Sequence, residues 1–114
     1  MWELAAEVWV VDNASVDGSE GMVSERFPQV RLLVSPENLG YSVGNNVALQ
    51  ALGFQPLASE AQPLNAYPWM AERPRPAGHP RHVWLLNPDT VVQGEAPAQL
   101  VRFMDETPLA GACG

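Results

Sequence analysis

Basic residues are scarce in this sequence of 114 residues, and lysine is absent altogether. Six arginines stand against thirteen acidic residues, which gives a formal net charge of -7 at pH 7. A nucleic-acid-binding protein needs a basic face to neutralise phosphates, and docking on an anionic membrane by charge alone needs one as well. The charge balance therefore argues against both kinds of partner.

Cysteine and long apolar runs are also nearly missing. The single cysteine, Cys113, excludes an intramolecular disulfide framework and a metal cage built from thiolates. The longest apolar runs, such as residues 8–11, are far too short to cross a bilayer. The first residues lack the basic and apolar regions of a signal peptide. We therefore expect a cytoplasmic protein, a location that also allows peripheral attachment to the membrane.

Hydrophobic patterning predicts strands that alternate with helices. A continuous apolar run predicts a strand at 8–11, and mainly apolar segments predict strands at 30–34 and 82–86, with weaker candidates at 91–92 and 109–112. Apolar residues at helical spacing, bounded by capping and turn residues, predict helices at about 17–26, 42–52 and 97–106. With 46% hydrophobic residues the chain can bury a modest core. The order β-α-β-α-insert-β-α predicts the α/β class, with a Rossmann-like, mainly parallel sheet and flanking helices.

The ends of these helices carry their own predictions. Asp17 is expected to cap the first helix and Ser42 the second, because short polar side chains bind the free N–H groups of a first turn. Gly53 stands where a left-handed residue ends the second helix. Pro97 suits the first turn of the third helix.

Residues 54–81 interrupt the pattern with six of the chain's eleven prolines. No periodicity survives that proline density, and a connection of this length is uncommon inside a compact domain. We expect an inserted, partly mobile loop on the surface of one domain that spans residues 1–114. A linker between two domains is the weaker alternative, because neither flank has enough core residues to fold by itself.

Polar residues follow the predicted strands, and parallel strands would bring them to one edge of the sheet. Asp12 and Asn13 could accept hydrogen bonds from a base or a ribose. The loop and helix start at 38–46 could meet a phosphate with backbone N–H groups. Asp89 with Asn87 could form half of a site for Mg²⁺ or Mn²⁺ that substrate phosphates complete. Taken singly, each cluster is explained as well by a turn.

Taken in order, the clusters resemble the family 2 glycosyltransferases of GT-A fold, and most closely their rhamnosyltransferase-like branch, which serves cell wall polysaccharide biosynthesis. The resemblance covers about residues 7–53 and 82–114 and excludes the proline-rich insert. Three motifs carry it, which read VVDNASVDGS at 10–19, NLGYSVGNN at 38–46 and LLNPDT at 85–90.

The resemblance implies a nucleotide-sugar site on matching residues. Asp12 would bind the nucleotide base, with Asn13 beside it in the same site. Asn38, Gly40 and Asn46 would shape the pyrophosphate and sugar side of the pocket.

The resemblance also implies a divalent metal. Asn-Pro-Asp occupies the place of the family's Asp-x-Asp motif, so Asp89 would hold Mg²⁺ or Mn²⁺ on the diphosphate, with Asn87 assisting. A metal there neutralises the charge of the departing diphosphate. Because only one carboxylate is present, metal affinity without bound nucleotide should be weak.

Two parts of the family pattern are missing from the sequence. A nucleotide-contacting strand would precede Met1, and the acceptor half with the catalytic base would follow Gly114. We therefore expect a partial GT-A nucleotide-binding subdomain without a catalytic residue. It would bind a dTDP- or UDP-sugar for transfer to a saccharide or lipid-linked acceptor, but would be inactive alone. Missing strands would leave exposed sheet edges, which predict self-association.

Two other functions stay open at this point. The chain could be a non-catalytic nucleotide-binding or interaction module from a truncated frame. A nucleotidyltransferase of related topology is less favoured, because such enzymes usually begin with a glycine-rich basic loop and none is present here.

Overall fold

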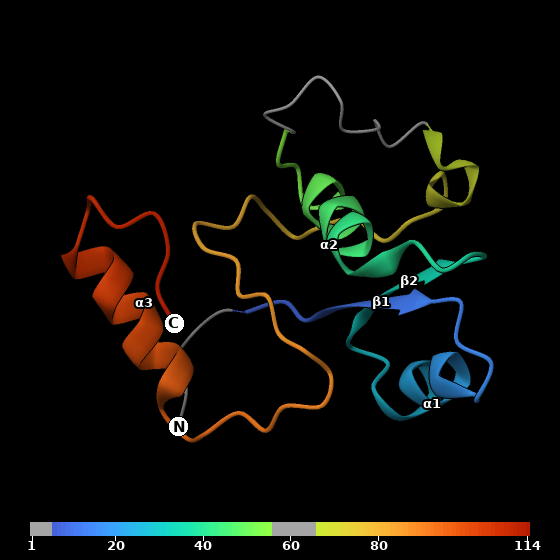
Figure 1. Cartoon of the computed structure of the whole chain (residues 1–114), viewed down its shortest axis with the longest axis horizontal. Coiled ribbons are helices and arrows are strands. Elements are labelled where there is room, and N and C mark those ends of the chain that lie inside the picture. The colour runs from blue at the N-terminus through green and yellow to red at the C-terminus, as the bar shows by residue number, and fades with distance from the viewer. Residues whose placement is uncertain (1–5, 56–65) are drawn as a thin grey trace. The chain divides into compact units, whose positions relative to one another are not determined.

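The computed structural model describes residues 6–55 and 66–114, which divide into two compact units (Figure 1). One unit spans residues 7–80 and holds both strands of the structure's sheet. The other contains residues 81–114 and is built around one helix. In the described ranges, no helix is long and apolar enough to cross a membrane.

The sheet consists of two parallel strands, β1 (Trp9–Asn13) and β2 (Arg31–Ser35). Both lie close to their predicted positions. The helices α1 (Ser19–Arg26) and α2 (Gly40–Ala51) flank the strands on opposite sides (Figure 1). This architecture confirms the α/β class and is consistent with a partial Rossmann-like fold. The register pairs the last residue of β1, Asn13, with the last residue of β2, Ser35, so the two strands end together.

The two helix starts differ from each other in how their N–H groups are bound. At α1, the predicted cap is one residue off: the N-cap is Gly18, and the preceding Asp17 carboxylate accepts a hydrogen bond of 3.0 Å from the Ser19 N–H. The Ser19 hydroxyl and N–H hold the pKa of Asp17 below its ordinary value of 3.8. At α2, the predicted cap was wrong, because the helix begins at Gly40 and Ser42 therefore lies inside its first turn. Gly53 has a φ of +99°, which confirms the left-handed residue after α2.

The core contains a residue from the predicted surface loop. Leu33 of β2 and Val47 and Ala51 of α2 are buried together with Met70, whose exposed fraction is 1%. Met70 ends a short 3-10 helix, η2 (Pro68–Met70). The flexible thioether side chain fits irregular gaps, so one residue can anchor a segment that has no periodic pattern. The described part of the loop is thus not all at the surface, and residues 56–65 of the prediction lie outside the described residues.

The predicted strand at 82–86 was wrong: residues 81–94 form no strand in the structure, and neither do residues 109–112. The apolar side chains of residues 83–86 are between 38% and 49% exposed. An apolar run indicates that side chains favour burial, but a strand also needs a backbone partner for its hydrogen bonds. The helix that follows, α3 (Ala96–Glu106), confirms its prediction, with Pro97 in the first turn.

The start of this unit is fastened to α3 by side chains. Asp105 of α3 accepts a hydrogen bond of 3.2 Å from Arg81 and lies 3.1 Å from Nε2 of His82. The hydrogen bond with His82, followed by that with Arg81, holds the pKa of the Asp105 carboxyl below its ordinary value of 3.8. The two residues that precede the apolar segment are thus bound to α3.

Candidate functional site

Asp12 is the most buried polar residue at the strand ends apart from Ser35, with an exposed fraction of 6%. One of its carboxylate oxygens, Oδ2, accepts a hydrogen bond of 3.1 Å from the Ser15 N–H. Ala14 lies between these residues in the left-handed region, at a φ of 61°. Such a conformation is costly for a residue with a side chain, and here it turns the chain back so that Ser15 can reach Asp12. This segment therefore forms a turn, and the same turn holds the Asp12 carboxylate in place.

Asn13 binds the loop that follows β2. Its Oδ1 accepts a hydrogen bond of 2.7 Å from the Leu39 N–H, and its Nδ2 donates one of 3.3 Å to the Gly40 carbonyl. Asn13 thereby joins the end of β1 to the start of α2, across 26 positions of the sequence. Two of the predicted clusters thus meet at one edge of the sheet.

The loop itself is ordered by its own polar groups. The Asn38 Oδ1 accepts a hydrogen bond of 2.9 Å from the Gly40 N–H. Gly40 has a φ of +76°, a conformation that favours glycine. Both residues are exposed, so they stand at the surface next to the buried end of β1. The structure therefore brings Asn13, Asn38 and Gly40 into one neighbourhood, whereas the Asp12 side chain lies on the other face of β1, because successive side chains of a strand point to opposite faces.

Asn46 stands apart from this neighbourhood. The side of α2 that faces the strands carries the buried residues Gly44, Val47 and Ala51. Asn46 is exposed and lies off that side, because successive helical residues are rotated by about 100°. Its expected role in the sugar pocket stays a prediction.

Two residues at this edge were missed by the sequence reasoning. Ser35 has an exposed fraction of 1%, and its hydroxyl donates a hydrogen bond of 2.6 Å to the Glu37 carbonyl. The Ser-Pro pair after the strand could have indicated this turn. Gly44 lies where α2 packs on β1: a Cβ there would make ordinary contacts, at 3.7 Å from Asn13 Nδ2 and 3.8 Å from Val11 Cγ1. The position of that glycine against β1 depends on how the helix packs on the sheet, which the sequence alone does not indicate.

Asn87 and Asp89 lie in the second unit. Both the N–H and the hydroxyl of Thr90 donate hydrogen bonds to the Asn87 carbonyl, at 3.2 Å and 2.6 Å. Pro88 therefore stands at the second position of a turn, which is the structural interpretation that the sequence left open. Asp89 is exposed beside it. That Asp89 and Asp12 share one site stays a prediction.

The donor set around Asp89 is compatible with half of a metal site. A carboxylate and an amide oxygen are ligands of the hard kind that Mg²⁺ and Mn²⁺ prefer. Within residues 6–55 and 66–114, no three His, Cys, Asp or Glu side chains gather as a group that could hold a metal ion. Further ligands would thus have to come from a bound substrate.

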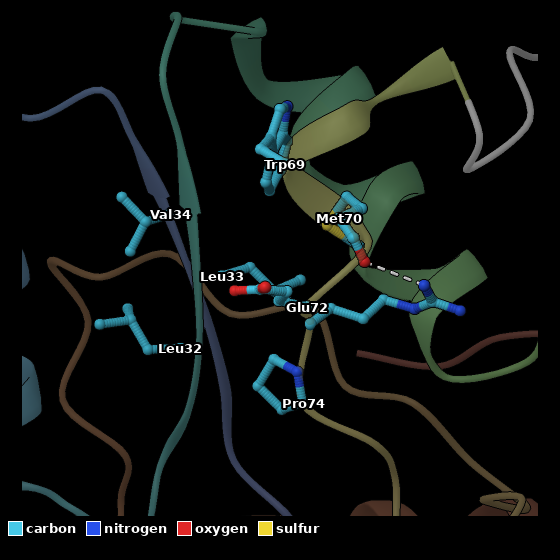
Figure 2. A pocket seen from close by; sticks show the side chains of 8 residues that line it. Leu32, Leu33, Val34, Trp69, Met70, Glu72 and Pro74 are labelled. Atoms are coloured by element: carbon cyan, nitrogen blue, oxygen red, sulfur yellow. Dashed lines mark hydrogen bonds between the residues drawn. The ribbon is translucent and has the colours of Figure 1, made fainter.

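A small cavity of about 180 Å³ lies elsewhere in the first unit (Figure 2). Leu32, Leu33 and Val34 of β2 stand on one side of it, and Trp69 and Met70 on the other. The predicted site residues do not line it. This cavity therefore belongs to the packing of the proline-rich segment on β2 and not to the strand ends.

Comparison with known proteins identifies relatives that share one name. Two curated proteins, from two strains of Mycobacterium tuberculosis, are each named N-acetylglucosaminyl-diphospho-decaprenol L-rhamnosyltransferase. Each is 30% identical to this chain over 114 residues, which is 98% of the chain. The chain is thus distantly related to glycosyltransferases.

The similarity extends over only part of these relatives. The glycosyltransferase-like chain spans 32% of the length of each curated relative that it matches. No family model matches the sequence, and no solved structure matches it either.

Proposed function

We propose that this chain is the nucleotide-sugar-binding part of a family 2 glycosyltransferase of GT-A fold. One observation carries the proposal: the Asn13 side chain joins the 38–40 loop to the end of β1, where Asp12 precedes Asn13, at the carboxyl ends of two parallel strands. Ligands of open α/β sheets bind at that edge. The similarity to L-rhamnosyltransferases over nearly the whole chain supports the same class of reaction.

The proposed donor is a nucleotide-diphosphate sugar, with a dTDP- or UDP-sugar as the first choice. Asp12 would accept hydrogen bonds from the base, because its carboxylate is held in place by the Ser15 N–H. Asn38, Gly40 and Asn46 would line the pyrophosphate and sugar side. The first turn of α2 adds the partial positive charge of a helix N-terminus, which favours a diphosphate.

Asp89 and Asn87 would hold Mg²⁺ or Mn²⁺ in this proposal. A divalent ion on the diphosphate stabilises the negative charge that develops on the leaving group. The chain supplies one carboxylate from an exposed turn, so the phosphate oxygens would complete the coordination. Transfer with inversion also needs a carboxylate base that takes the acceptor's proton, and we assign no such base within these 114 residues.

The acceptor would be a saccharide or a lipid-linked saccharide. The name of these relatives joins L-rhamnose with N-acetylglucosaminyl-diphospho-decaprenol. We propose the corresponding chemical classes for a longer protein that contains this chain, with the 114 residues alone binding donor but not transferring sugar.

The decisive experiment titrates UDP and dTDP into the 114-residue chain in the presence of Mn²⁺, by calorimetry. We expect saturable binding that Asp12→Ala weakens by about tenfold or more, since a hydrogen bond to a charged group contributes about 1.5–3 kcal/mol. Glu25→Ala is the matched control, because it removes an exposed carboxylate of α1. No binding of either nucleotide, or equal binding by the Asp12 and Glu25 variants, would overturn the proposal.

A further inference from the structure

The side-chain amide of Asn13 forms two hydrogen bonds within the protein. Its oxygen accepts from the Leu39 N–H at 2.7 Å, and its nitrogen donates to the Gly40 carbonyl at 3.3 Å. The shorter of these bonds is well within the range of strong N–H···O geometry. An amide with this pattern is engaged with the backbone of a loop, in contrast to the Asp12 carboxylate beside it, which makes one hydrogen bond within the described residues.

The partner of this amide is the start of a helix. Leu39 is the residue that precedes α2, and no side chain from the usual capping position bonds the first turn. Free N–H groups at a helix start need acceptors. Asn13 supplies one from a neighbouring strand, and Asn38 supplies the next, to the Gly40 N–H at 2.9 Å. The start of α2 is thus set by an amide that is distant in sequence.

The backbone around Asn13 leaves little freedom for another arrangement. Ala14 on one side and Gly40 on the other both have left-handed φ angles, of 61° and 76°. Gly44 of α2 lies beside the amide, since a Cβ there would be in ordinary contact with Asn13 Nδ2 at 3.7 Å. Asn13 is half-buried between these segments. A side chain enclosed in this way is suited to fix the distance between the strand end and the loop.

We infer that Asn13 is a positioning residue of the nucleotide-sugar site and not a ligand of the donor. It would hold the Asn38–Gly40 loop against the end of β1, so that the loop is already ordered when the donor binds. The inference rests on the proposed function and narrows the role that the sequence pattern implied for Asn13. In its absence the loop would have to be ordered by the ligand, which lowers affinity.

The test compares Asn13→Ala and Asn13→Asp in the 114-residue chain, with Asn45→Ala as the control. Asn45 also carries an amide that bonds backbone, to the Tyr41 carbonyl at 2.9 Å, but within α2 itself. Two quantities are measured for each variant: hydrogen exchange of the Leu39 N–H by NMR, and the affinity for UDP with Mn²⁺ by calorimetry. Far-UV circular dichroism checks that each variant is folded.

A positioning role predicts linked changes. Asn13→Ala should speed Leu39 exchange and weaken UDP binding, each by about tenfold, which corresponds to the loss of one hydrogen bond. Asn13→Asp retains an oxygen that accepts from Leu39 but loses the donor to the Gly40 carbonyl, so it should keep Leu39 better protected than Asn13→Ala does. Asn45→Ala should leave both quantities near those of the unaltered chain.

Three outcomes would overturn the inference. A folded Asn13→Ala with unchanged Leu39 exchange would show that the amide does not order the loop. Should Asn13→Asp leave Leu39 no better protected than Asn13→Ala does, the hydrogen bond to Leu39 would not be the one that orders the loop. Unchanged UDP affinity in both Asn13 variants would exclude any role in the site. If Asn13→Ala is unfolded, Asn13→Asp is compared with the unaltered chain, and unchanged Leu39 exchange together with unchanged UDP affinity would overturn the inference. Failure of the unaltered chain to bind UDP or dTDP would instead overturn the proposed function, on which the inference rests.

Discussion

The carboxylate of Glu7 accepts a hydrogen bond of 2.6 Å from the backbone N–H of Ala77. Its other oxygen accepts one of 2.9 Å from the indole N–H of Trp9. Glu7 stands just before β1, and Ala77 belongs to the proline-rich segment. The end of that segment is therefore fastened to the start of the sheet, as Met70 fastens its middle part to the core.

This contact predicts a pH dependence of stability. The Trp9 and Ala77 N–H groups lower the pKa of Glu7 from its ordinary value of 4.5. A carboxyl whose pKa is depressed by folding stabilises the protein above its unfolded pKa, and that contribution is lost as the pH falls through the folded pKa. The melting temperature of the unaltered chain should thus exceed that of Glu7→Gln near neutral pH, and the difference should shrink below the ordinary value of 4.5.

Thermal unfolding followed by circular dichroism at a series of pH values measures this difference. Glu25→Gln is the control, because it removes an exposed charge from α1 without touching the proline-rich segment. A Glu7→Gln variant whose deficit does not change with pH would contradict the prediction.

The burial of Met70, in the proline-rich segment, predicts that its substitution strongly lowers stability. Its side chain is 1% exposed, so Met70→Ala should leave a cavity and lower the free energy of unfolding by about 2–5 kcal/mol. Met22 in α1 is 42% exposed, and Met22→Ala should cost far less. Urea unfolding of the two variants measures the contrast. Equal effects would mean that the segment does not pack on the core in solution.

The backbone conformation of Gly40 predicts that a substitution there lowers the stability of the chain. Its φ of +76° lies in the left-handed region, and no atom lies within 4 Å of the position of a Cβ there. Gly40→Ala should therefore destabilise the chain by about 1–2 kcal/mol through strain alone. Gly21, inside α1, also has open space around it but no left-handed φ, so Gly21→Ala should stabilise by about 0.5–1 kcal/mol. Opposite signs in urea unfolding are the expected result.

The proposed metal role of Asp89 predicts that Mn²⁺ binding becomes measurable only in the presence of the nucleotide. One carboxylate from a turn should bind Mn²⁺ weakly by itself. Mn²⁺ and UDP together should bind the chain more tightly than either does alone. Asp89→Ala should then lower the affinity for UDP by at least about tenfold in Mn²⁺ and have little effect in EDTA. Glu106→Ala, an exposed acid at the end of α3, is the control. Unchanged Mn²⁺-dependent binding in Asp89→Ala would show that the metal assignment is wrong.

Local pattern determined much of this protein. Apolar runs located β1 and β2, spacing and caps located α1, α2 and α3 to within a few residues, and Gly53 and Pro97 stand where their backbone preferences required. These features depend on residues near each other in the chain, whose side chains and φ angles respond to their neighbours. The position of Asp12 at a strand end follows from the same local information.

Tertiary structure alone decided three other matters. It placed Met70 in the core, it left residues 82–86 without a strand, and it gave the Asn13 amide to the Leu39 backbone. Each depends on which distant segment covers an apolar side chain or meets a hydrogen-bonding group. Apolar periodicity reports that a face needs covering but not what covers it, because burial and hydrogen bonding are satisfied by partners in space and not by neighbours in sequence.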